Sequence, residues 1–373
     1  MKKTLLSFGI ACLAFSSSRA QSIEIKNPLD ENRTELISIP YTKFSKHFGV
    51  DSIFTIKDKT TGAVYVHQLE KLGRSQIQNV LIQVSVASKK KLNLVVQKEQ
   101  APSFPAKTFA RYVPERFDDF AWENDVVAFR MYGKSLEGRK DDAQGMDYWA
   151  KRTTDLVINK WYKEDDYHKD HGQGLDYYSV GQTLGAGDLA LYVNGKVHYT
   201  KHYRTHQVLD NGPLRTTFKL GFETENIEGN TITFSKTITL DAGKQFNKIV
   251  VDFDNQNANQ TPIVIGLARR SEQNPEVKFD AKDKTLVYWE PNIQNYGRTG
   301  TALYLPKQKL TFHDTDKKQF LIQTSIKNNT SFVYYNGAAW DRAGKIQNFD
   351  DWEDFVEDYA ESINKPLKVK LKK

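Results

Sequence analysis

The sequence contains a single cysteine, Cys12, among 373 residues. Cys12 lies in a short apolar stretch near the N-terminus that we expect to be removed during export. The mature chain would then carry no thiol, which excludes disulfide bonds, thiolate zinc sites and a cysteine nucleophile. Stability must therefore come from a hydrophobic core, and the chain is long enough to form one.

Long hydrophobic runs are also lacking beyond the first 20 residues. Lys2 and Lys3 precede an apolar stretch over residues 4–15, and Ser-Arg-Ala at residues 18–20 forms a small-residue cleavage site. Residues 1–20 therefore have the pattern of a cleavable signal peptide, which predicts a periplasmic protein. No later stretch approaches the roughly 20 apolar residues that a membrane span needs, so we expect no membrane association.

Charge of one sign is not in large excess. The chain has 53 Lys and Arg against 46 Asp and Glu, a formal net charge of +7. Loss of Lys2, Lys3 and Arg19 with the signal peptide lowers this to +4. Acidic and basic residues are interleaved, whereas nucleic-acid-binding proteins carry basic stripes. The composition excludes nucleic acid and favours an anionic carbohydrate as the partner.

Strand patterns dominate the remaining sequence. Residues 22–25, 79–86, 92–96 and 231–234 are short, rich in β-branched residues and bounded by turn residues. This spacing predicts an all-β protein, a large antiparallel β-sandwich with a few short helices.

Two helices and one domain boundary are expected. Residues 147–162 form the first helix, and the second begins at Asp350, with Glu353 closing a capping box and apolar side chains on one face. Residues 367–371 alternate like a final edge strand. Prolines within residues 101–106 divide the chain into an N-terminal β module (21–106), which either folds alone or adds strands to one sandwich, and a main catalytic unit (107–373).

Five of the eight histidines lie between residues 168 and 206. On one strand over residues 195–206, His198, His202, Arg204 and His206 would share a face, because side chains alternate. Such a face either lines a polar cleft or faces water. Residues four apart on a strand are about 13 Å apart, too far for one ion, so we expect no metal site.

The segment around His168 and His171 is a second candidate site. Imidazole titrates near neutral pH, and Asp170 beside His171 is able to fix its tautomer, so His171 is a candidate general acid or base. Gly172 and Gly174 would let the backbone pass close to a ligand. The alternative is a loop with two exposed histidines.

Residues 116–133 concentrate carboxylates, arginines and aromatic rings. Structural ion pairing explains such a set, but Glu123 and Asn124 are also suited to bind sugar hydroxyls, and Arg130 to bind a carboxylate. The Gly-Ala-Gly at residues 185–187 lacks the strand-turn-helix context of a dinucleotide site, so no cofactor is expected. Trp340 belongs to a late aromatic cluster that serves either sugar stacking or core packing.

Several blocks, taken in order, resemble one bacterial family. They are DDFAWEND (118–125), RMYG (130–133), GMDYW (145–149), DHGQGLD (170–176) and GAG (185–187). The family is common in carbohydrate-utilisation clusters of Bacteroidetes, was long catalogued as a domain of unknown function, and includes the ulvan oligosaccharide dehydratases. The resemblance implies a sugar-acting sandwich of the mutarotase-like supersandwich type. It also implies removal of water, the 4-hydroxyl and the C5 proton, from a non-reducing-end uronic acid.

This chemistry needs a cation against the carboxylate, a base for the C5 proton and an acid for the departing hydroxide. The candidate cations are Arg130, Arg152 and Arg204. The candidate bases are His171, His202 and His206, and the candidate acids are Tyr148 and Tyr177. From residue chemistry alone we expect catalysis at His171, His202, Tyr148 and Arg204, and substrate binding at Arg130, Arg152, Glu123, Asn124, His168, His206, Tyr177, Trp149 and Trp340.

Three other functions use similar residues. A polysaccharide lyase takes the same C5 proton but expels a glycosidic oxygen, so it shortens the polymer. A mutarotase or epimerase on a similar sandwich is another enzyme class. A sugar-binding protein without catalysis would need aromatic surfaces but no converging titratable groups.

Overall fold

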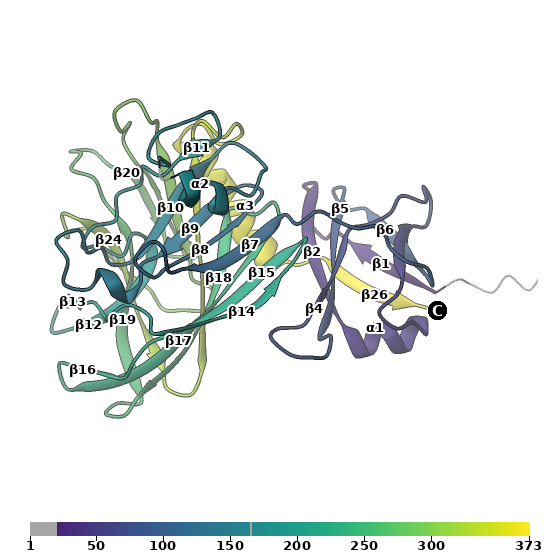
Figure 1. Cartoon of the computed structure of the whole chain (residues 1–373), viewed down its shortest axis with the longest axis horizontal. Coiled ribbons are helices and arrows are strands. Elements are labelled where there is room, and N and C mark those ends of the chain that lie inside the picture. The colour runs from purple at the N-terminus through teal and green to yellow at the C-terminus, as the bar shows by residue number, and fades with distance from the viewer. Residues whose placement is uncertain (1–20, 165) are drawn as a thin grey trace, which may run out of the picture.

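The computed structural model describes residues 21–164 and 166–373, and β-strands are its main secondary structure, with three α-helices among the described residues (Figure 1). The expected signal peptide falls on residues 1–20 and lies outside the described part. Antiparallel strands form several packed sheets, which confirms the predicted all-β sandwich fold. No helix within the described ranges is long and apolar enough to cross a membrane.

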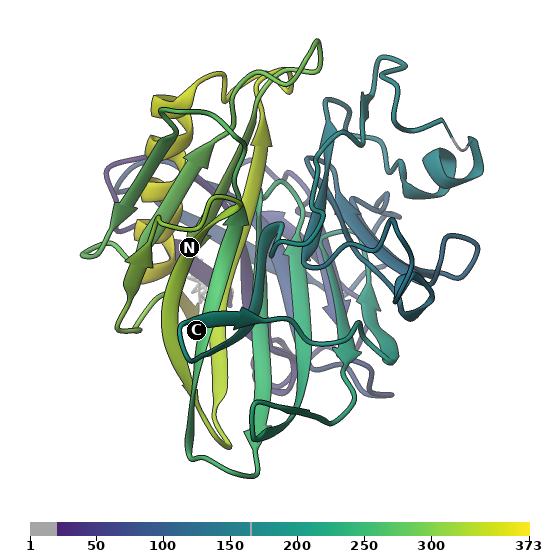
Figure 2. The ribbon, with the colours of Figure 1, turned by 90° about the vertical axis from the view of Figure 1, so that its left-hand side faces the viewer.

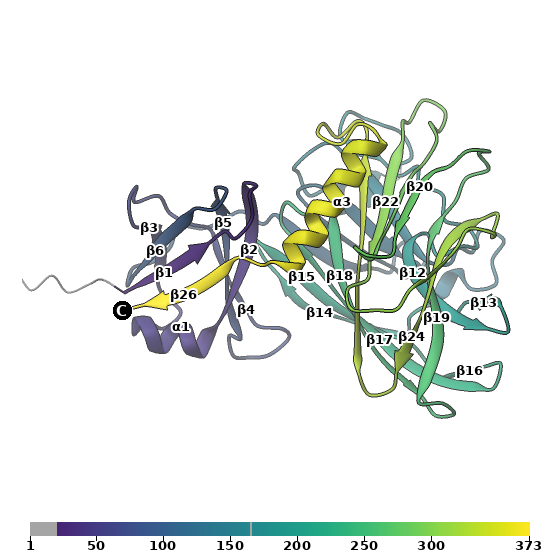
Figure 3. The same cartoon turned by 180° about the vertical axis from the view of Figure 1, so that it is seen from behind.

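The N-terminal part forms a small sandwich of two sheets and one helix, α1 (Tyr41–Phe48). One sheet has the order β26 (Lys368–Lys372), β1 (Ser22–Lys26), β6 (Lys91–Gln97) and β3 (Thr55–Asp58); the other has β2 (Arg33–Pro40), β5 (Asn79–Val86) and β4 (His67–Glu70). Strand β26 returns from the far end of the chain to pair with β1, as Figure 3 shows. It is an edge strand, as the sequence predicted.

The main sandwich contains three sheets. The largest is β14 (Thr205–Asn211), β15 (Arg215–Gly221), β17 (Asn230–Asp241), β18 (Phe246–Asn255), β25 (Ser331–Trp340), β22 (Thr299–Tyr304), β21 (Thr285–Trp289) and β20 (Glu276–Asp280), with β16 (Glu225–Ile227) beside β17. A second is β13 (Lys196–His198), β12 (Ala186–Val193), β19 (Gln260–Ala268), β24 (Gln319–Lys327) and β23 (Thr311–His313). The third is β11 (Gly174–Leu175), β10 (Met146–Lys151), β9 (Ala128–Met131), β8 (Asp119–Asn124) and β7 (Thr108–Val113).

The main core lies between these sheets and follows from strand periodicity. In β17, buried and less buried side chains alternate along the strand, as expected for a strand with one core face. Core residues from all three sheets form one cluster, including Phe120, Phe218 and Ile265. In Figure 2 the helix α3 (Phe349–Asn364) lies on one side of the large sheet, and the β7–β11 sheet lies on the other side of the molecule.

The predicted helix over residues 147–162 is wrong. Residues 146–151 form strand β10, and only Ile158–Glu164 are helical, as α2. Both faces of β10 are buried, one in the main core and one under α2, so the strand lacks the polar face that would have revealed its period of two. The second helix is confirmed as α3, but its cap is Asn348, whose side chain accepts a hydrogen bond from the Asp351 N–H at 2.9 Å.

The predicted single strand over residues 195–206 is also wrong. Strand β13 ends at His198, β14 begins at Thr205, and no regular ladder spans the residues between them. The histidines therefore do not share one alternating face. The turn between the two strands directs His202 inward and leaves His206 exposed.

Candidate active site

Several connecting segments meet at one end of the main sandwich, near β11 and β20 at the top of Figure 1. They are the residues after β10 and β11, the β21–β22 connection and the chain after β25. Register brings two of them together, because Thr299 at the start of β22 pairs with Trp340 at the end of β25. Loops at the end of a rigid sandwich commonly carry binding and catalytic groups.

Trp340 lies at the centre of this end and is 1% exposed as part of the main core, so it serves core packing and not sugar stacking. Its indole Nε1 donates to the carbonyl of Tyr296 at 2.8 Å. The guanidinium carbon of Arg152 lies 5.2 Å from the indole centroid, and the ring of Tyr177 lies 6.4 Å from it. Gly297 has a φ of +100°, and a Cβ there would lie 2.3 Å from Oδ1 of Asp341. Arg152, Tyr177 and Trp340, all predicted site residues, are thus brought together.

Arg152 is exposed and only partly engaged. Its Nη2 lies 2.5 Å from Oδ2 of Asp170, and its Nε donates to the carbonyl of Gly172 at 3.1 Å. Among the described residues, its Nη1 has no hydrogen-bond acceptor. Arg152, Trp340 and Lys345 line a pocket of about 390 Å³ between the end of β10 and helix α3. An anionic ligand in this pocket would meet the cations of Arg152 and Lys345, but also the carboxylate of Asp125.

Tyr177 connects the surface to a buried carboxyl group. Its hydroxyl lies 2.6 Å from the hydroxyl of Thr299, and its ring is half-buried. Burial raises the pKa of Tyr177, and Thr299 opposes part of that rise. The Thr299 side chain also lowers the pKa of Glu290, so it is close to both groups. Thr299 therefore lies between the half-buried Tyr177 and the buried Glu290.

Glu290 is completely buried, and its pKa is raised to about 7 by burial, against the opposing effect of Arg270. Nη2 of Arg270 lies 2.5 Å from Oε1 of Glu290, and the same guanidinium lies over the ring of Tyr178 at 5.0 Å. Neither carboxylate oxygen of Glu290, nor the hydroxyl of Tyr178, has a hydrogen-bond partner of good geometry among the described residues. Buried polar atoms left in this state mark sites that water or a ligand completes.

Glu290, Arg270 and Thr299 were missed by the sequence analysis. They come from three separate segments, and no spacing in the sequence relates them. In the sequence, Arg270 belongs to an Arg-Arg pair and Glu290 follows an apolar strand. Many ordinary surface residues have the same sequence context, so neither residue could be singled out. Tyr148, a predicted acid, is buried in the main core, and its pKa is raised by burial and by the nearby Tyr177.

Glu123 and Asn124 lie beside the pocket, against its lining residues Lys151 and Val126, and hold the backbone together. The buried carboxylate of Glu123 accepts from Nζ of Lys151 at 2.7 Å and from the N–H groups of Val157 and Ile158 at 2.8 Å, so it holds the start of α2. The Asn124 amide donates to two carbonyls of the β17–β18 turn. Its carbonyl oxygen accepts two N–H groups of its own turn.

Arg130 lies in a buried cluster with three carboxylates. Its guanidinium is 3.6 Å from Asp119, 2.5 Å from Asp147 and 3.0 Å from Asp176. Burial raises the pKa of Asp119 and Asp176 to about 6 and that of Asp147 to about 7. Four of the sequence blocks each contribute one member of this cluster. Trp149 packs against it, with the Arg130 guanidinium carbon 5.4 Å from the indole centroid.

Within the described ranges, no group of three or more acidic or imidazole side chains is placed to hold a metal ion.

The remaining histidines are spread over the surface. His168 and His171 are each about 60% exposed; Nδ1 of His168 lies 3.7 Å from Asp176, and Nε2 of His171 lies 3.3 Å from Asp166. His206 stacks on Tyr112 with ring centroids 4.2 Å apart. None of these three rings lines the pocket beside Trp340, and neither does Tyr177, which reaches this end through its contact with the Trp340 ring.

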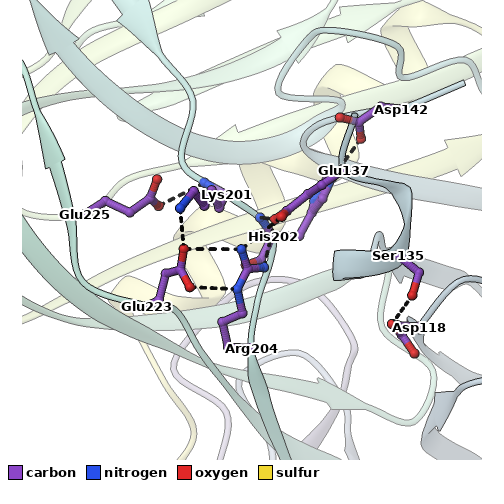
Figure 4. A network of polar contacts seen from close by, with 9 residues as sticks. All are labelled: Asp118, Ser135, Glu137, Asp142, Lys201, His202, Arg204, Glu223 and Glu225. Carbon is purple, nitrogen blue, oxygen red and sulfur yellow. Dashed lines mark hydrogen bonds and ion pairs between the residues drawn. The ribbon is translucent and has the colours of Figure 1, made fainter. Parts of the chain in front are cut away.

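His202 and Arg204 belong to a separate network, drawn in Figure 4. Nε2 of the buried His202 lies 2.9 Å from Oδ1 of Asp142. All five N–H donors of Arg204 are used, by Glu137, Glu223 and the His202 carbonyl. No donor remains to bind a substrate carboxylate.

Comparison with known proteins gives a family and a fold. The family described as "Domain of unknown function (DUF4861)" matches residues 25–369. A protein of Formosa agariphila named "Uncharacterized protein P7" is 29% identical over 401 residues, with complete coverage of both chains. Among solved structures, a protein in the glycosyl hydrolase family 38 from Enterococcus faecalis aligns with a TM-score of 0.53 and 8% identity. That alignment covers 95% of this chain but 48% of the other, so the chain spans about half of that protein and shares its fold.

Proposed function

The chain belongs to the DUF4861 family, a domain of unknown function, and from that premise we propose that it is an exported oligosaccharide dehydratase. Its substrate is an anionic oligosaccharide, of the ulvan type, with a uronic acid at the non-reducing end. The product is a 4,5-unsaturated uronate. The observation that supports this most strongly is the arrangement of Arg152 and Tyr177 on the Trp340 indole, with Glu290 behind Tyr177.

The reaction removes the C5 proton and the 4-hydroxyl. The C5–H bond breaks, its electron pair forms the C4–C5 double bond, and the C4–O bond breaks. One proton added to the departing oxygen gives water, so the step is balanced without an oxidant or reductant. The C5 proton becomes acidic enough only when a cation neutralises the adjacent carboxylate.

Arg152 is the group that binds this carboxylate. It is exposed at the pocket, retains an Nη1 without a partner among the described residues, and its planar guanidinium matches a carboxylate. Trp340 is only 1% exposed, so it packs against Arg152 and Tyr177 and helps to position them, and it offers no face to a sugar ring. Arg204 has all its donors used, and Arg130 is buried among three carboxylates, so both arginines hold the fold instead.

Tyr177 transfers the protons. Its oxygen takes the C5 proton while its own proton passes to the Thr299 hydroxyl, 2.6 Å away. Thr299 in turn passes a proton to the nearby Glu290 carboxylate, a step that requires a hydrogen bond to form between them, because neither Glu290 oxygen has a partner of good geometry among the described residues. When the C5 proton and the 4-hydroxyl lie on the same face of the sugar ring, the same phenol then protonates the departing 4-hydroxyl. A carboxyl group with a pKa of about 7 is suited to this exchange because it gains and loses a proton near neutral pH.

The test is incubation of the mature protein with saturated uronate-ended oligosaccharides of defined length, followed by mass spectrometry and ultraviolet absorbance. The proposal predicts loss of one water, a new absorbance from the conjugated double bond, and no chain shortening. New absorbance with shorter products would instead establish a polysaccharide lyase. Unchanged oligosaccharides of several uronate types, with measurable affinity, would leave a sugar-binding protein.

A further inference from the structure

One face of the N-terminal sandwich carries a concentration of lysines. In the sheet of β26, β1, β6 and β3, the apolar side chains of Ile23, Ile25 and Leu94 point into the module core. The alternate residues therefore point outward. The outward residues that are charged are Lys26, Lys57, Lys91, Lys368, Lys370 and Lys372, with Glu24 as the one carboxylate. We call these six lysines the lysine face.

The strand register places like charges directly opposite one another. Lys26 on β1 pairs with Lys368 on β26 and with Lys91 on β6, so three lysines form a row across three neighbouring strands. Neighbouring strands are about 4.8 Å apart, and outward residues on one strand are about 7 Å apart. Like charges in such positions destabilise a sheet.

The carboxylates nearby neutralise only part of this charge. Glu24 lies 3.0 Å from Lys91 and 3.6 Å from Lys372, and Glu99 lies 2.7 Å from Lys57. Within residues 21–164 and 166–373, Lys26 and Lys368 have no acidic partner, and Lys370 lies opposite Glu24 in the register without forming an ion pair with it. All three are exposed.

Protection of an edge strand against aggregation explains part of the pattern. Lysines on an edge discourage pairing with another chain, and β26 is an edge strand. That explanation does not extend to Lys26 and Lys91, which lie on strands with partners on both sides. The row across three strands therefore requires another cause.

We propose that the lysine face binds a linear polysaccharide bearing carboxylate or sulfate groups, at a site separate from Trp340. The strands of this sheet carry no aromatic residue on which nucleobases would stack. Of the exposed large hydrophobic side chains, Ile53 and Val208 lie outside this sheet, and Val64 bridges to Lys57 at its edge. One valine is too small an apolar surface to insert into a bilayer. A flat grid of ammonium groups matches a repeating polyanion, and it would hold the protein on its polymer while oligosaccharides react elsewhere.

The test uses the mature chain and polygalacturonate as the probe, with dextran as the uncharged control, in affinity electrophoresis and calorimetry. The test variant combines Lys26→Gln, Lys368→Gln and Lys370→Gln. The control variant combines Lys282→Gln, Lys309→Gln and Lys317→Gln, three exposed lysines of the main sandwich. Both variants lose the same charge, and thermal unfolding checks that both fold.

We expect the test variant to bind polygalacturonate about tenfold more weakly and the control to change by less than about twofold. Binding of the wild type should disappear near about 0.5 M salt, because exposed charges are screened. Equal weakening of both variants would overturn the proposal, as would binding to anionic phospholipid vesicles without binding to polygalacturonate. Dehydration of short oligosaccharides should be the same in both variants, so failure of this proposal is distinct from failure of the proposed activity.

Discussion

The hydroxyl of Tyr177 lies 2.6 Å from that of Thr299, and this contact joins a half-buried phenol to the region of the buried Glu290. The phenol reaches the surface beside Trp340, whereas the carboxyl group does not. A proton at the surface can therefore exchange with a group that titrates near neutral pH without exposing that group to water. This separation distinguishes the Tyr177 site from the Arg130 cluster, whose carboxyl groups are all buried.

Replacement of Tyr177 by Phe should lower kcat by about 10²- to 10⁴-fold, because the proton-transferring oxygen is removed while the ring remains. Steady-state rates from the absorbance of the unsaturated product measure this. Tyr199→Phe is the control, since its hydroxyl also makes a hydrogen bond, to the Gln182 carbonyl at 3.0 Å, away from Trp340. Equal losses in the two variants would contradict the assignment of Tyr177.

Replacement of Arg152 by Gln should raise KM by about tenfold or more and also lower kcat, because the substrate carboxylate is held and neutralised by the same group. The thermal midpoint should change little, since the Arg152 side chain is exposed. Arg139→Gln removes another exposed arginine, which is paired with Asp141 at 2.9 Å, and should leave the kinetics unchanged. A normal KM and kcat for Arg152→Gln would show that the carboxylate binds elsewhere.

Replacement of Arg204 by Gln should act on stability and not on activity. The change leaves Glu137 and Glu223 without their shared partner, which should cost about 1–3 kcal/mol in the free energy of unfolding. Chemical denaturation measures that loss, and kcat/KM at a temperature where the variant is folded should stay within about threefold of wild type. A selective loss of kcat with a normal free energy of unfolding would return Arg204 and His202 to the active site.

The fold class, the second helix and the final edge strand were predictable because their patterns are local. The apolar face of α3 repeats at helical spacing around Trp352 and Val356, and β26 alternates residue by residue. Strand β10 was not predictable in the same way, because both of its faces are buried and its composition resembles that of a helix. Burial on two faces removes the polar half of the pattern on which periodicity depends.

The candidate site was predictable only in part. Arg152, Tyr177 and Trp340 were named from their chemistry, but their convergence depends on three segments that the sheets bring together. Glu290 and Arg270 show no such chemistry in sequence, since an acidic and a basic residue 20 positions apart are ordinary. The histidine-rich segment was prominent in sequence, yet its members lie in a network around His202 or on the exposed surface.

The glycines of the 170–176 block provide a structural contrast. A Cβ at Gly174, where φ is +120°, would lie 2.0 Å from the carbonyl oxygen of Ala150, whereas a Cβ at Gly172 would meet nothing within 4 Å. Gly174→Ala should therefore break the β10–β11 pairing and destabilise the fold by more than about 3 kcal/mol. Gly172→Ala, with a φ of +99°, should cost about 1–2 kcal/mol. Similar losses in the free energy of unfolding of the two variants, measured by chemical denaturation, would show that φ alone, and not contact with Ala150, requires glycine at residue 174.

The buried Glu290 should make the stability of the protein fall as pH rises. Its pKa is about 7 when folded and has an ordinary value of 4.5, so the folded state holds the proton more tightly than the unfolded state does. The stability that this proton contributes is complete below about pH 4.5, is lost as pH rises through about 7, and amounts to about 3 kcal/mol at most.

Glu290→Gln removes this titration, although it also leaves Arg270 unpaired and lowers stability at every pH. The free energy of unfolding measured from pH 5 to pH 8 should therefore decline less steeply in the variant than in wild type, while the Asp119, Asp147 and Asp176 carboxyls contribute equally to both. Parallel curves for the two proteins would show that Glu290 is ionised throughout this range and takes no proton from Tyr177.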